Sequence, residues 1–498
     1  LKCLISVFFL LIPTILFGAS FTCAVKAIRK NISSSARTVG DSVMYNTIGA
    51  ALGAFFGGFI LLPNFGIKIS LIICVIMALF LGIIILICFN TSLKAKLIPC
   101  ILSILIIVSS LIIPPNWNVQ ILSSGPYFSP WDYVKNSEII LREKLDSQRV
   151  VYYNEGVAST ISVIRDLGED LQYCSEGKVE ADTTERGMVI QRMMGHLPML
   201  FHPKPKRVMN LGLGAGVTFG SLGCYPVDDL EVVEIEPSVV KVAKIWKDYN
   251  HDILSHPNVK VTINDGRNHL FLCDKPYDVI TSDPIEPIVA GAGNLYTVDF
   301  FELAKSKLTE NGIMAQFLPL YEMSNFDYQM IMRSFAHVFP DCIVFFTGVD
   351  TILVGGKNPN FLDIPIAAEK FKIPAVRESL KEIGFDDPEM ILSMFVACLS
   401  DKNKIWDEGD LNTDNNPFIE FSAPKSAFRY RPNENQAILL KNYSAMPNAI
   451  LSKLDVDKKN SIINAHKAIK IMLQANIDQA ANTDRIGIES EDLMLKKH

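Results

Sequence analysis

The chain has 498 residues, of which 49% are apolar and 20% charged, and its mean hydropathy of +0.24 argues against an entirely soluble protein. Of its 47 Lys/Arg and 53 Asp/Glu residues, residues 1–114 hold eight and one, so a basic N-terminal quarter of net charge +7 precedes an acidic body of net charge −13. This acidic body argues against nucleic-acid binding. The ten cysteines include no Cys-x-x-Cys pair, which argues against a zinc knuckle.

The N-terminal quarter contains four uncharged stretches, each long enough to cross a hydrocarbon core of ~30 Å as a helix. A cleaved signal peptide is an alternative for the first stretch, although the later spans make cleavage unnecessary. We therefore expect a transmembrane helical domain of about four spans over residues 1–114, embedded in a lipid bilayer. Because the chain starts with Leu, further N-terminal spans stay open. The four stretches are Leu4–Val25, Ser42–Ile67, Ile69–Leu93 and the run from Leu97 to Pro114.

The orientation of these spans gives two conflicting predictions. Residues 26–41 carry four basic side chains and, with Lys94 and Lys96, should lie in the cytoplasm. Four spans would then place everything after residue 114 on the opposite side of the membrane. The chemistry inferred below needs cytosolic metabolites, so a cytoplasmic body is favoured on that ground and the side stays open.

A linker and a small antiparallel β layer are expected over residues 115–185. Three short runs of β-forming residues, separated by turn residues, predict this layer. The runs are Val150–Tyr153, Ser159–Ile164 and Leu171–Cys174.

Residues 186–358 alternate strand and helix patterns, which predicts an α/β domain with a parallel, doubly wound sheet. A terminal hairpin of Cys342–Thr347 and Thr351–Gly355 makes the last strand antiparallel. That is the arrangement of Rossmann-like S-adenosylmethionine transferases rather than of a paired dinucleotide-binding half. The expected parallel strands are Arg207–Leu211, Leu230–Ile235, Val259–Ile263 and Tyr277–Thr281.

Three strand ends carry residues suited to a nucleoside. The first is followed by a glycine loop containing Gly212, Gly214 and Gly216, which lets a ligand approach the backbone. Glu234 ends the next strand, 22 residues after Gly212, where a carboxylate can accept both ribose hydroxyls. Asp265 ends the third strand and offers an acceptor for an adenine amino group.

The remainder, residues 359–498, is expected to be a helical C-terminal extension. Its helical patterns cover Ala375–Ile383, Glu389–Leu399, Asn435–Tyr443 and Ile462–Gln474.

An ordered set of motifs resembles the spermidine synthase (polyamine aminopropyltransferase) family over about residues 150–358. The wider chain resembles the membrane-fused bacterial branch of that family, through residues 45–49, Tyr321 and 411–417, and this implies a multi-pass protein of the bacterial inner membrane. The catalytic-domain motifs are Gly195-His196-Leu197-Pro198-Met199, Val233-Glu234-Ile235-Glu236, Asn264-Asp265-Gly266, Tyr277-Asp278-Val279-Ile280 and Ser282-Asp283-Pro284-Ile285-Glu286-Pro287.

The resemblance implies transfer of an aminopropyl group from decarboxylated S-adenosylmethionine to an amine, with release of methylthioadenosine. The donor is a co-substrate, and neither a metal nor a tightly bound cofactor is implied. Asp283 would be the catalytic carboxylate, since an attacking ammonium must lose a proton and a carboxylate can hold it and accept that proton. Asp283 also has a purely structural interpretation, because Asp-Pro commonly begins a turn.

Other residues are assigned by the same resemblance. Glu234 would bind the ribose, Asp265 the adenine, and the three loop glycines would admit the donor. Gln191, His196 and Glu286 are expected on the amine side, and a homodimer is a possible assembly. A histidine ahead of Leu-Pro, such as His196, more often caps a helix or fills a pocket wall than takes part in catalysis. Gln191 is equally compatible with a solvent-facing position.

Departures from the family pattern keep other functions open. Gly214 replaces the loop Asp that meets the aminopropyl ammonium, Ile190 replaces a pocket Tyr, and no Tyr lies within residues 347–353. The acceptor amine is therefore not defined. One alternative is a methyl- or aminocarboxypropyl-transferase that uses intact S-adenosylmethionine. Another is a non-catalytic membrane sensor or transport accessory that binds a polyamine or nucleoside.

Overall fold

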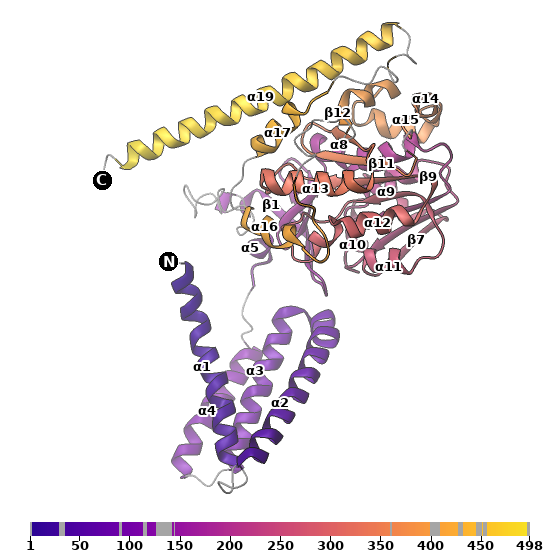
Figure 1. Cartoon of the computed structure of the whole chain (residues 1–498). Coiled ribbons are helices and arrows are strands. Elements are labelled where there is room, and N and C mark those ends of the chain that lie inside the picture. Colours follow the sequence, from indigo (N-terminus) through magenta and orange to yellow (C-terminus); the bar gives the residue numbers. More distant parts are fainter. Residues whose placement is uncertain are drawn as a thin grey trace. The chain divides into compact units, whose positions relative to one another are not determined.

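The computed structural model describes residues 2–28, 35–88, 92–112, 117–125, 142–143, 145–358, 361–398, 409–426, 432–444, 451 and 456–495. Much of the expected linker, residues 126–141, lies outside this description. The chain divides into two compact units (Figure 1). The first, called the N-terminal unit below, is Leu1–Asn116 with Glu155–Val157, and the second, called the C-terminal unit, is Trp117–Asn154 with Ala158–His498.

The N-terminal unit is almost entirely helical over its described residues up to residue 112. Two stretches, Ser6–Ala27 and Ala36–Ile87, are long and apolar enough to cross a membrane, and Lys96–Ile112 is a shorter apolar helix. Gly66 breaks the second stretch with φ 71° and ψ 175°, so this stretch supplies two helices that meet at a kink. The helices are α1 (Lys2–Ile28), α2 (Ser35–Phe56), a π-helical turn (Gly57–Leu61), α3 (Leu62–Cys88) and α4 (Leu93–Ile112).

The helices of this unit leave their apolar side chains largely uncovered. None of the apolar window of Ser6–Ala27 is buried within the protein, and only 6% of that of Ala36–Ile87 is. Phe17, for example, is 77% exposed. A core helix of a water-soluble domain would instead bury one face.

The C-terminal unit begins with a short helix, α5 (Val119–Leu122), and a four-stranded sheet in the order β1-β2-β3-β4. The strands β2/β3 and β3/β4 pair antiparallel, as expected for the small β layer. The fourth strand is an addition to the sequence-based expectation, which placed no strand over these residues. The strands are β1 (Gln148–Glu155), β2 (Thr160–Asp166), β3 (Leu171–Ser175) and β4 (Lys178–Asp182).

An eight-stranded sheet follows, in the order β12-β10-β11-β9-β8-β5-β6-β7. Five neighbouring strands, from β7 to β9, run parallel, and β11 pairs antiparallel with both β9 and β10. This confirms the expected Rossmann-like α/β fold with an antiparallel strand near the end of the sheet. The strands are β5 (Arg207–Leu211), β6 (Asp229–Glu234), β7 (Val259–Ile263), β8 (Tyr277–Ser282), β9 (Leu308–Leu318), β10 (Ile343–Phe346), β11 (Thr351–Gly356) and β12 (Phe395–Cys398).

Helices cover both faces of this sheet because neighbouring strand residues point to opposite sides. Val208 belongs to one hydrophobic core with Leu197 of α8, whereas Met209 belongs to a second core with Phe300 of α12. The helices between the strands are α8 (Glu185–Phe201), α9 (Val217–Gly223), α10 (Val239–Ile245), the 3₁₀ turn Ile253–Ser255, α11 (Gly266–Leu272), the 3₁₀ turn Ala292–Leu295, α12 (Val298–Ser306) and α13 (Asn325–Val338).

The C-terminal extension is mostly helical, but the helix expected over Glu389–Leu399 is wrong. Residues Pro388–Met394 form a 3₁₀ helix, and Phe395–Cys398 form β12, which pairs antiparallel with β10. Phe395, Val396 and Ala397 are fully or almost fully buried there. The helices are α14 (Ile364–Lys370), α15 (Pro374–Lys381), α16 (Phe418–Ser426), α17 (Pro432–Lys441) and the long α19 (Val456–Leu495) (Figure 1).

Candidate active site

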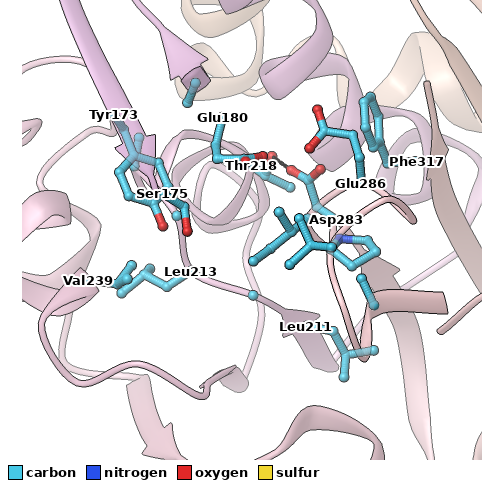
Figure 2. A pocket seen from close by; sticks show the side chains of 18 of the residues that line it. Tyr173, Ser175, Glu180, Leu211, Leu213, Thr218, Val239, Asp283, Glu286 and Phe317 are labelled. Atoms are coloured by element: carbon cyan, nitrogen blue, oxygen red, sulfur yellow. Dashed lines mark hydrogen bonds between the residues drawn. The ribbon is translucent and has the colours of Figure 1, made fainter. Parts of the chain in front are cut away.

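A cavity of about 840 Å³ lies at the carboxyl ends of the parallel strands β5, β6, β7 and β8. In doubly wound sheets, ligands bind in the crevice at this edge. The loops that follow these strands form one wall, and residues of the four-stranded sheet and α8 form another. Figure 2 shows Glu180, Thr218, Asp283 and Glu286 gathered in one part of the cavity.

The glycine loop between β5 and α9 allows the backbone to approach the cavity. Gly212, Gly214 and Gly216 all have positive φ, at 87°, 51° and 82°. A Cβ at Gly212 would lie 3.0 Å from the carbonyl oxygen of Asp283, and one at Gly216 would lie 2.8 Å from Asn250 Nδ2. Both the backbone conformation and the close neighbours therefore require glycine at these two positions.

Glu234 lies at the end of β6 with its carboxylate held against the glycine loop. Its Oε2 accepts a hydrogen bond from the Leu213 N–H at 2.8 Å, and its Oε1 accepts one from the Glu236 N–H at 2.9 Å. Burial raises the pKa of Glu234, while these backbone hydrogen bonds oppose the rise. These backbone hydrogen bonds orient the carboxylate at the cavity wall, where its oxygens can only accept hydrogen bonds, as a ribose hydroxyl would require.

Asp265 also lines the cavity, and it is the N-cap of α11. Its Oδ1 accepts a hydrogen bond from the Asn268 N–H at 2.6 Å. The cap fixes the direction of the side chain, which leaves the second carboxylate oxygen available to a ligand.

Asp283 directly follows β8 and is held from two sides. Its N–H donates to the carbonyl of Leu211 at 3.3 Å, and Thr218 Oγ1 lies 2.9 Å from its Oδ2. Burial raises the pKa of Asp283 to about 6, with the negative charge of Glu286 adding to the rise and the Thr218 hydrogen bond opposing it. A carboxylate with this pKa is well matched to accept a proton near neutral pH.

Glu286 lies three residues further on and is only 3% exposed. Its Oε1 forms an ion pair with Lys178 Nζ and accepts a hydrogen bond from Tyr321 Oη at 2.7 Å. Although burial raises the pKa of Glu286, the charge of Lys178 and these hydrogen bonds lower it below its usual value. Glu286 is therefore an ionised carboxylate with a built-in counter-ion.

Lys178 is a site residue that the sequence interpretation missed. Its side chain is 7% exposed, and its Nζ also lies 3.5 Å from Glu322 Oε2 and 4.0 Å from Glu180 Oε1. Burial lowers the pKa of Lys178, but the surrounding carboxylates raise it further, so the pKa is above the ordinary value. The alternation of Lys178, Glu180 and Asp182 was the available signal, because it places three charged side chains on one face of a strand.

Asp350 is a second missed acid, located in the turn between β10 and β11. It is 4% exposed, lines the cavity, and accepts a hydrogen bond from the Leu320 N–H at 3.0 Å. Burial raises its pKa to about 7, and the negative charge of Glu286 contributes to the rise. In the sequence, Asp350 lies between the two arms of the predicted terminal hairpin, which by itself indicates a turn and not a cavity residue.

Gln191 and His196 both belong to α8 and have different surroundings. Gln191 lines the cavity and donates from Nε2 to the carbonyls of Asp182 and Gly187, at 3.0 and 2.9 Å. His196 does not line it. The ring is fully buried between Tyr225 Oη and Ser379 Oγ, at 3.0 and 2.9 Å, and burial lowers its pKa well below the ordinary value.

The structure thus brings together eight of the nine expected site residues and leaves His196 in the core. The described residues contain no group of three or more His, Cys, Asp or Glu side chains that could hold a metal ion. The eight that line the cavity are Gln191, Gly212, Gly214, Gly216, Glu234, Asp265, Asp283 and Glu286.

Comparison with solved structures gives neighbours of low overall similarity. A spermidine synthase in complex with the transition state analogue AdoDATO is 20% identical, with a TM-score of 0.39, and the match covers 47% of this chain and 88% of that one. The spermidine synthase from Thermotoga maritima is 19% identical, with a TM-score of 0.38 and the same coverage.

Comparison of sequences gives one matching domain and a set of relatives. Residues 187–359 match the model of the spermine/spermidine synthase domain. A polyamine aminopropyltransferase from Serratia proteamaculans is 31% identical over 192 residues, which are 38% of this chain and 60% of that protein. The polyamine aminopropyltransferase from Thermotoga maritima is 23% identical over 269 residues, or 53% of this chain and 89% of that protein. Residues 187–359 of this chain are therefore similar to the spermine/spermidine synthase domain, and the sequence relatives named above are polyamine aminopropyltransferases.

Proposed function

We propose that the protein transfers the aminopropyl group of decarboxylated S-adenosylmethionine to an amine and releases methylthioadenosine. The observation that carries this proposal is Asp283, a carboxylate of raised pKa at the sheet edge, in a cavity that also contains the ribose-suited Glu234. The family of the domain and the polyamine aminopropyltransferases among its relatives support the same reaction.

In the proposed reaction, the acceptor enters as an ammonium ion and pairs with Asp283. Asp283 accepts one proton, and the freed nitrogen lone pair attacks the methylene carbon next to the sulfonium. The carbon–sulfur bond breaks and its electron pair stays on sulfur, which gives a neutral thioether. The burial that raises the pKa of Asp283 strengthens it as a base.

The donor is held by the neighbouring strand ends in this proposal. Glu234 binds the ribose hydroxyls, Asp265 binds the adenine amino group, and the loop of Gly212, Gly214 and Gly216 contacts the donor through its backbone. The ionised Glu286 lies on the acceptor side with its counter-ion Lys178. Gln191 connects α8 to the end of β4, because its amide group donates to the backbone carbonyls of Asp182 and Gly187. In this proposal it fixes the position of the cavity wall that α8 forms.

We further propose that residues 1–114 form a multi-pass anchor in the bacterial inner membrane and that residues 186–358 form a catalytic domain on the cytoplasmic side. The uncovered apolar side chains of the N-terminal unit support lipid contact. Residues 115–185 connect the two parts, and residues 359–498 extend the catalytic domain. Membrane fractionation and protease accessibility of the catalytic domain in inverted vesicles test this arrangement, and crosslinking in detergent tests a homodimer.

A second candidate function rests on Gly214. A glycine has no side chain, so the loop offers no carboxylate here for the ammonium group of the donor. The nearest atom to a Cβ at this residue would be Tyr173 Cε1 at 3.8 Å, so the glycine is not required by crowding. Intact S-adenosylmethionine would then be the donor of a methyl or aminocarboxypropyl group. Calorimetry with both donors separates the two functions, since the proposed one requires tighter binding of the decarboxylated donor.

The proposed function is tested by incubating the purified full chain with decarboxylated S-adenosylmethionine and a panel of mono-, di- and polyamines. Release of methylthioadenosine with at least one amine, abolished by Asp283→Asn, is the expected result. The exposed Asp274 lies outside the cavity, so Asp274→Asn is the matched control. Ligand binding without turnover for every amine would favour a sensor or transport accessory instead.

A further inference from the structure

Residues 284–297, called the closing loop below, connect β8 to α12 and form part of the cavity wall. Glu286, Val289 and Gly291 of this loop line the cavity. Apart from the 3₁₀ turn Ala292–Leu295, the closing loop contains no helix or strand. Because regular backbone hydrogen bonds fix little of the closing loop, contacts with other segments of the chain contribute much to its conformation.

One such segment, residues 409–420, lies beyond the family domain, which ends at residue 359. Asn412 is fully buried and binds the end of the closing loop in both directions. Its Nδ2 donates to the carbonyl of Tyr296 at 3.0 Å, and its own carbonyl accepts from the Val298 N–H at 2.8 Å. The C-terminal extension thus continues the backbone hydrogen bonding of the loop.

Asp414 connects the closing loop to the nucleoside side of the cavity. Its Oδ1 accepts from Thr297 Oγ1 at 2.9 Å and from Arg267 Nη1 at 3.0 Å, while its Oδ2 forms an ion pair with Arg267 Nη2. Arg267 Nη1 also donates to the carbonyl of Asn294 at 2.8 Å. Arg267 follows Asp265 by two residues and lines the cavity. The Asp414 carboxylate therefore binds both the closing loop, through Thr297, and the segment after β7, through Arg267.

Glu420 binds the middle of the closing loop. Its Oε1 accepts from the Gly291 N–H at 2.8 Å. A Cβ at Gly293 would lie 2.7 Å from Glu420 Oε2, so the loop packs directly against this carboxylate. Glu420 Oε2 is buried and has no hydrogen-bond partner among the described residues.

We propose that residues 409–420 are a latch that holds the closing loop over the cavity and so positions Glu286 and, through the start of the loop, Asp283. Asn412, Asp414 and Glu420 are positioning residues, since they bind the loop and not the reacting atoms. The catalytic part of this inference rests on the proposed function, whereas the physical attachment of the loop does not. Latch variants retain the base Asp283 and the donor site but hold them in a looser geometry.

The test compares the full chain in detergent with Glu420→Gln, Glu420→Ala and Asp414→Asn, and with Asn415→Ala as the matched control on an exposed residue of the same segment. The first readout is cleavage by elastase after Val289 or Ala290, identified by mass spectrometry. We expect Glu420→Ala to speed this cleavage about tenfold, from loss of a charge-assisted hydrogen bond, and the two isosteric variants to speed it less. Bound methylthioadenosine should slow cleavage in wild type more than in the variants.

The second readout is kinetic. The variants should raise the KM for the amine and lower kcat, each about three- to tenfold, with the thermal unfolding temperature close to that of wild type. Wild-type cleavage rates and kinetics in all three variants would overturn the latch. If wild type shows no turnover, the proposed function fails, but the cleavage rates still decide the latch. If Glu420→Ala does not fold, the isosteric Glu420→Gln and Asp414→Asn decide it.

Discussion

Replacing Asp283 with Asn should make the protein more stable while it abolishes transfer. The carboxylate is buried, and its pKa of about 6 lies above the ordinary value of 3.8, so the folded state disfavours its ionised form. An Asn side chain carries no charge and keeps an oxygen that can accept from Thr218 Oγ1. The substitution therefore removes a destabilising charge without removing the hydrogen bond that orients the side chain.

The magnitude follows from the difference between the two pKa values. One pKa unit corresponds to about 1.4 kcal/mol, so the ionised carboxylate lowers the free energy of unfolding by about 3 kcal/mol. Because the folded-state pKa is the higher one, this destabilisation is absent below about pH 4, develops between about pH 4 and 6, and is complete above about pH 6. With about 2.1 cal/mol/K of unfolding entropy per residue over roughly 380 residues, the gain corresponds to about 4 °C in Tm.

Thermal unfolding of wild type, Asp283→Asn and the exposed control Asp274→Asn, measured in one detergent from pH 4 to 8, is the assay. The Tm of Asp283→Asn should exceed that of wild type at pH 7.5 and should approach it near pH 4, while the control follows wild type throughout. The reasoning is refuted if Asp283→Asn is no more stable than wild type at pH 7.5, or if its gain does not depend on pH.

Three further results are expected. The logarithm of kcat/KM should fall with a slope near one below about pH 6, as Asp283 becomes protonated and stops serving as a base; a profile that is flat between pH 5 and 8 would contradict this role. Lys178→Met should lower the free energy of unfolding by about 3 kcal/mol, because it leaves Glu286, Glu180 and Glu322 without their shared cation. Adding Glu286→Gln should recover part of that loss in denaturant unfolding, and strict additivity of the two changes would show that the pair is not coupled. Glu234→Gln should raise the Kd for methylthioadenosine about tenfold in calorimetry, since an amide is a weaker acceptor for ribose hydroxyls than a carboxylate; an unchanged Kd would exclude the ribose role.

The sequence predicted the strand-end residues because their placement follows from the topology alone. Gly212 and Asp283 directly follow a strand, Glu234 ends one, and Asp265 lies two residues beyond one. The carboxyl ends of parallel strands meet at one sheet edge. Their convergence in one cavity needs no knowledge of side-chain packing.

The residues contributed by other elements were harder to predict, because they depend on tertiary contacts. Glu180 reaches the cavity from β4, and Lys178 of the same strand is buried against Glu286. The strand buries Lys178 and leaves Val179 exposed, the reverse of what their polarity alone predicts. Strand β12 forms only because β10 offers an unpaired edge.

His196 was misplaced for a geometric reason. It follows Gln191 by five residues on α8, and at about 100° per residue the two side chains point some 140° apart. Gln191 faces the cavity, so His196 faces the core. The family motif that contains His196 identifies the helix but does not specify which of its residues contact a ligand.

The central claim is that this cavity transfers an aminopropyl group with Asp283 as the base. The most direct measurement quantifies methylthioadenosine and the aminopropylated amine in the same time course, for the wild-type full chain and for Asp283→Asn. We predict equal molar amounts of the two products from wild type and no detectable amount of either from Asp283→Asn, which stays folded. Product formation by Asp283→Asn at the wild-type rate, or nucleoside release without an alkylated amine, would contradict the account.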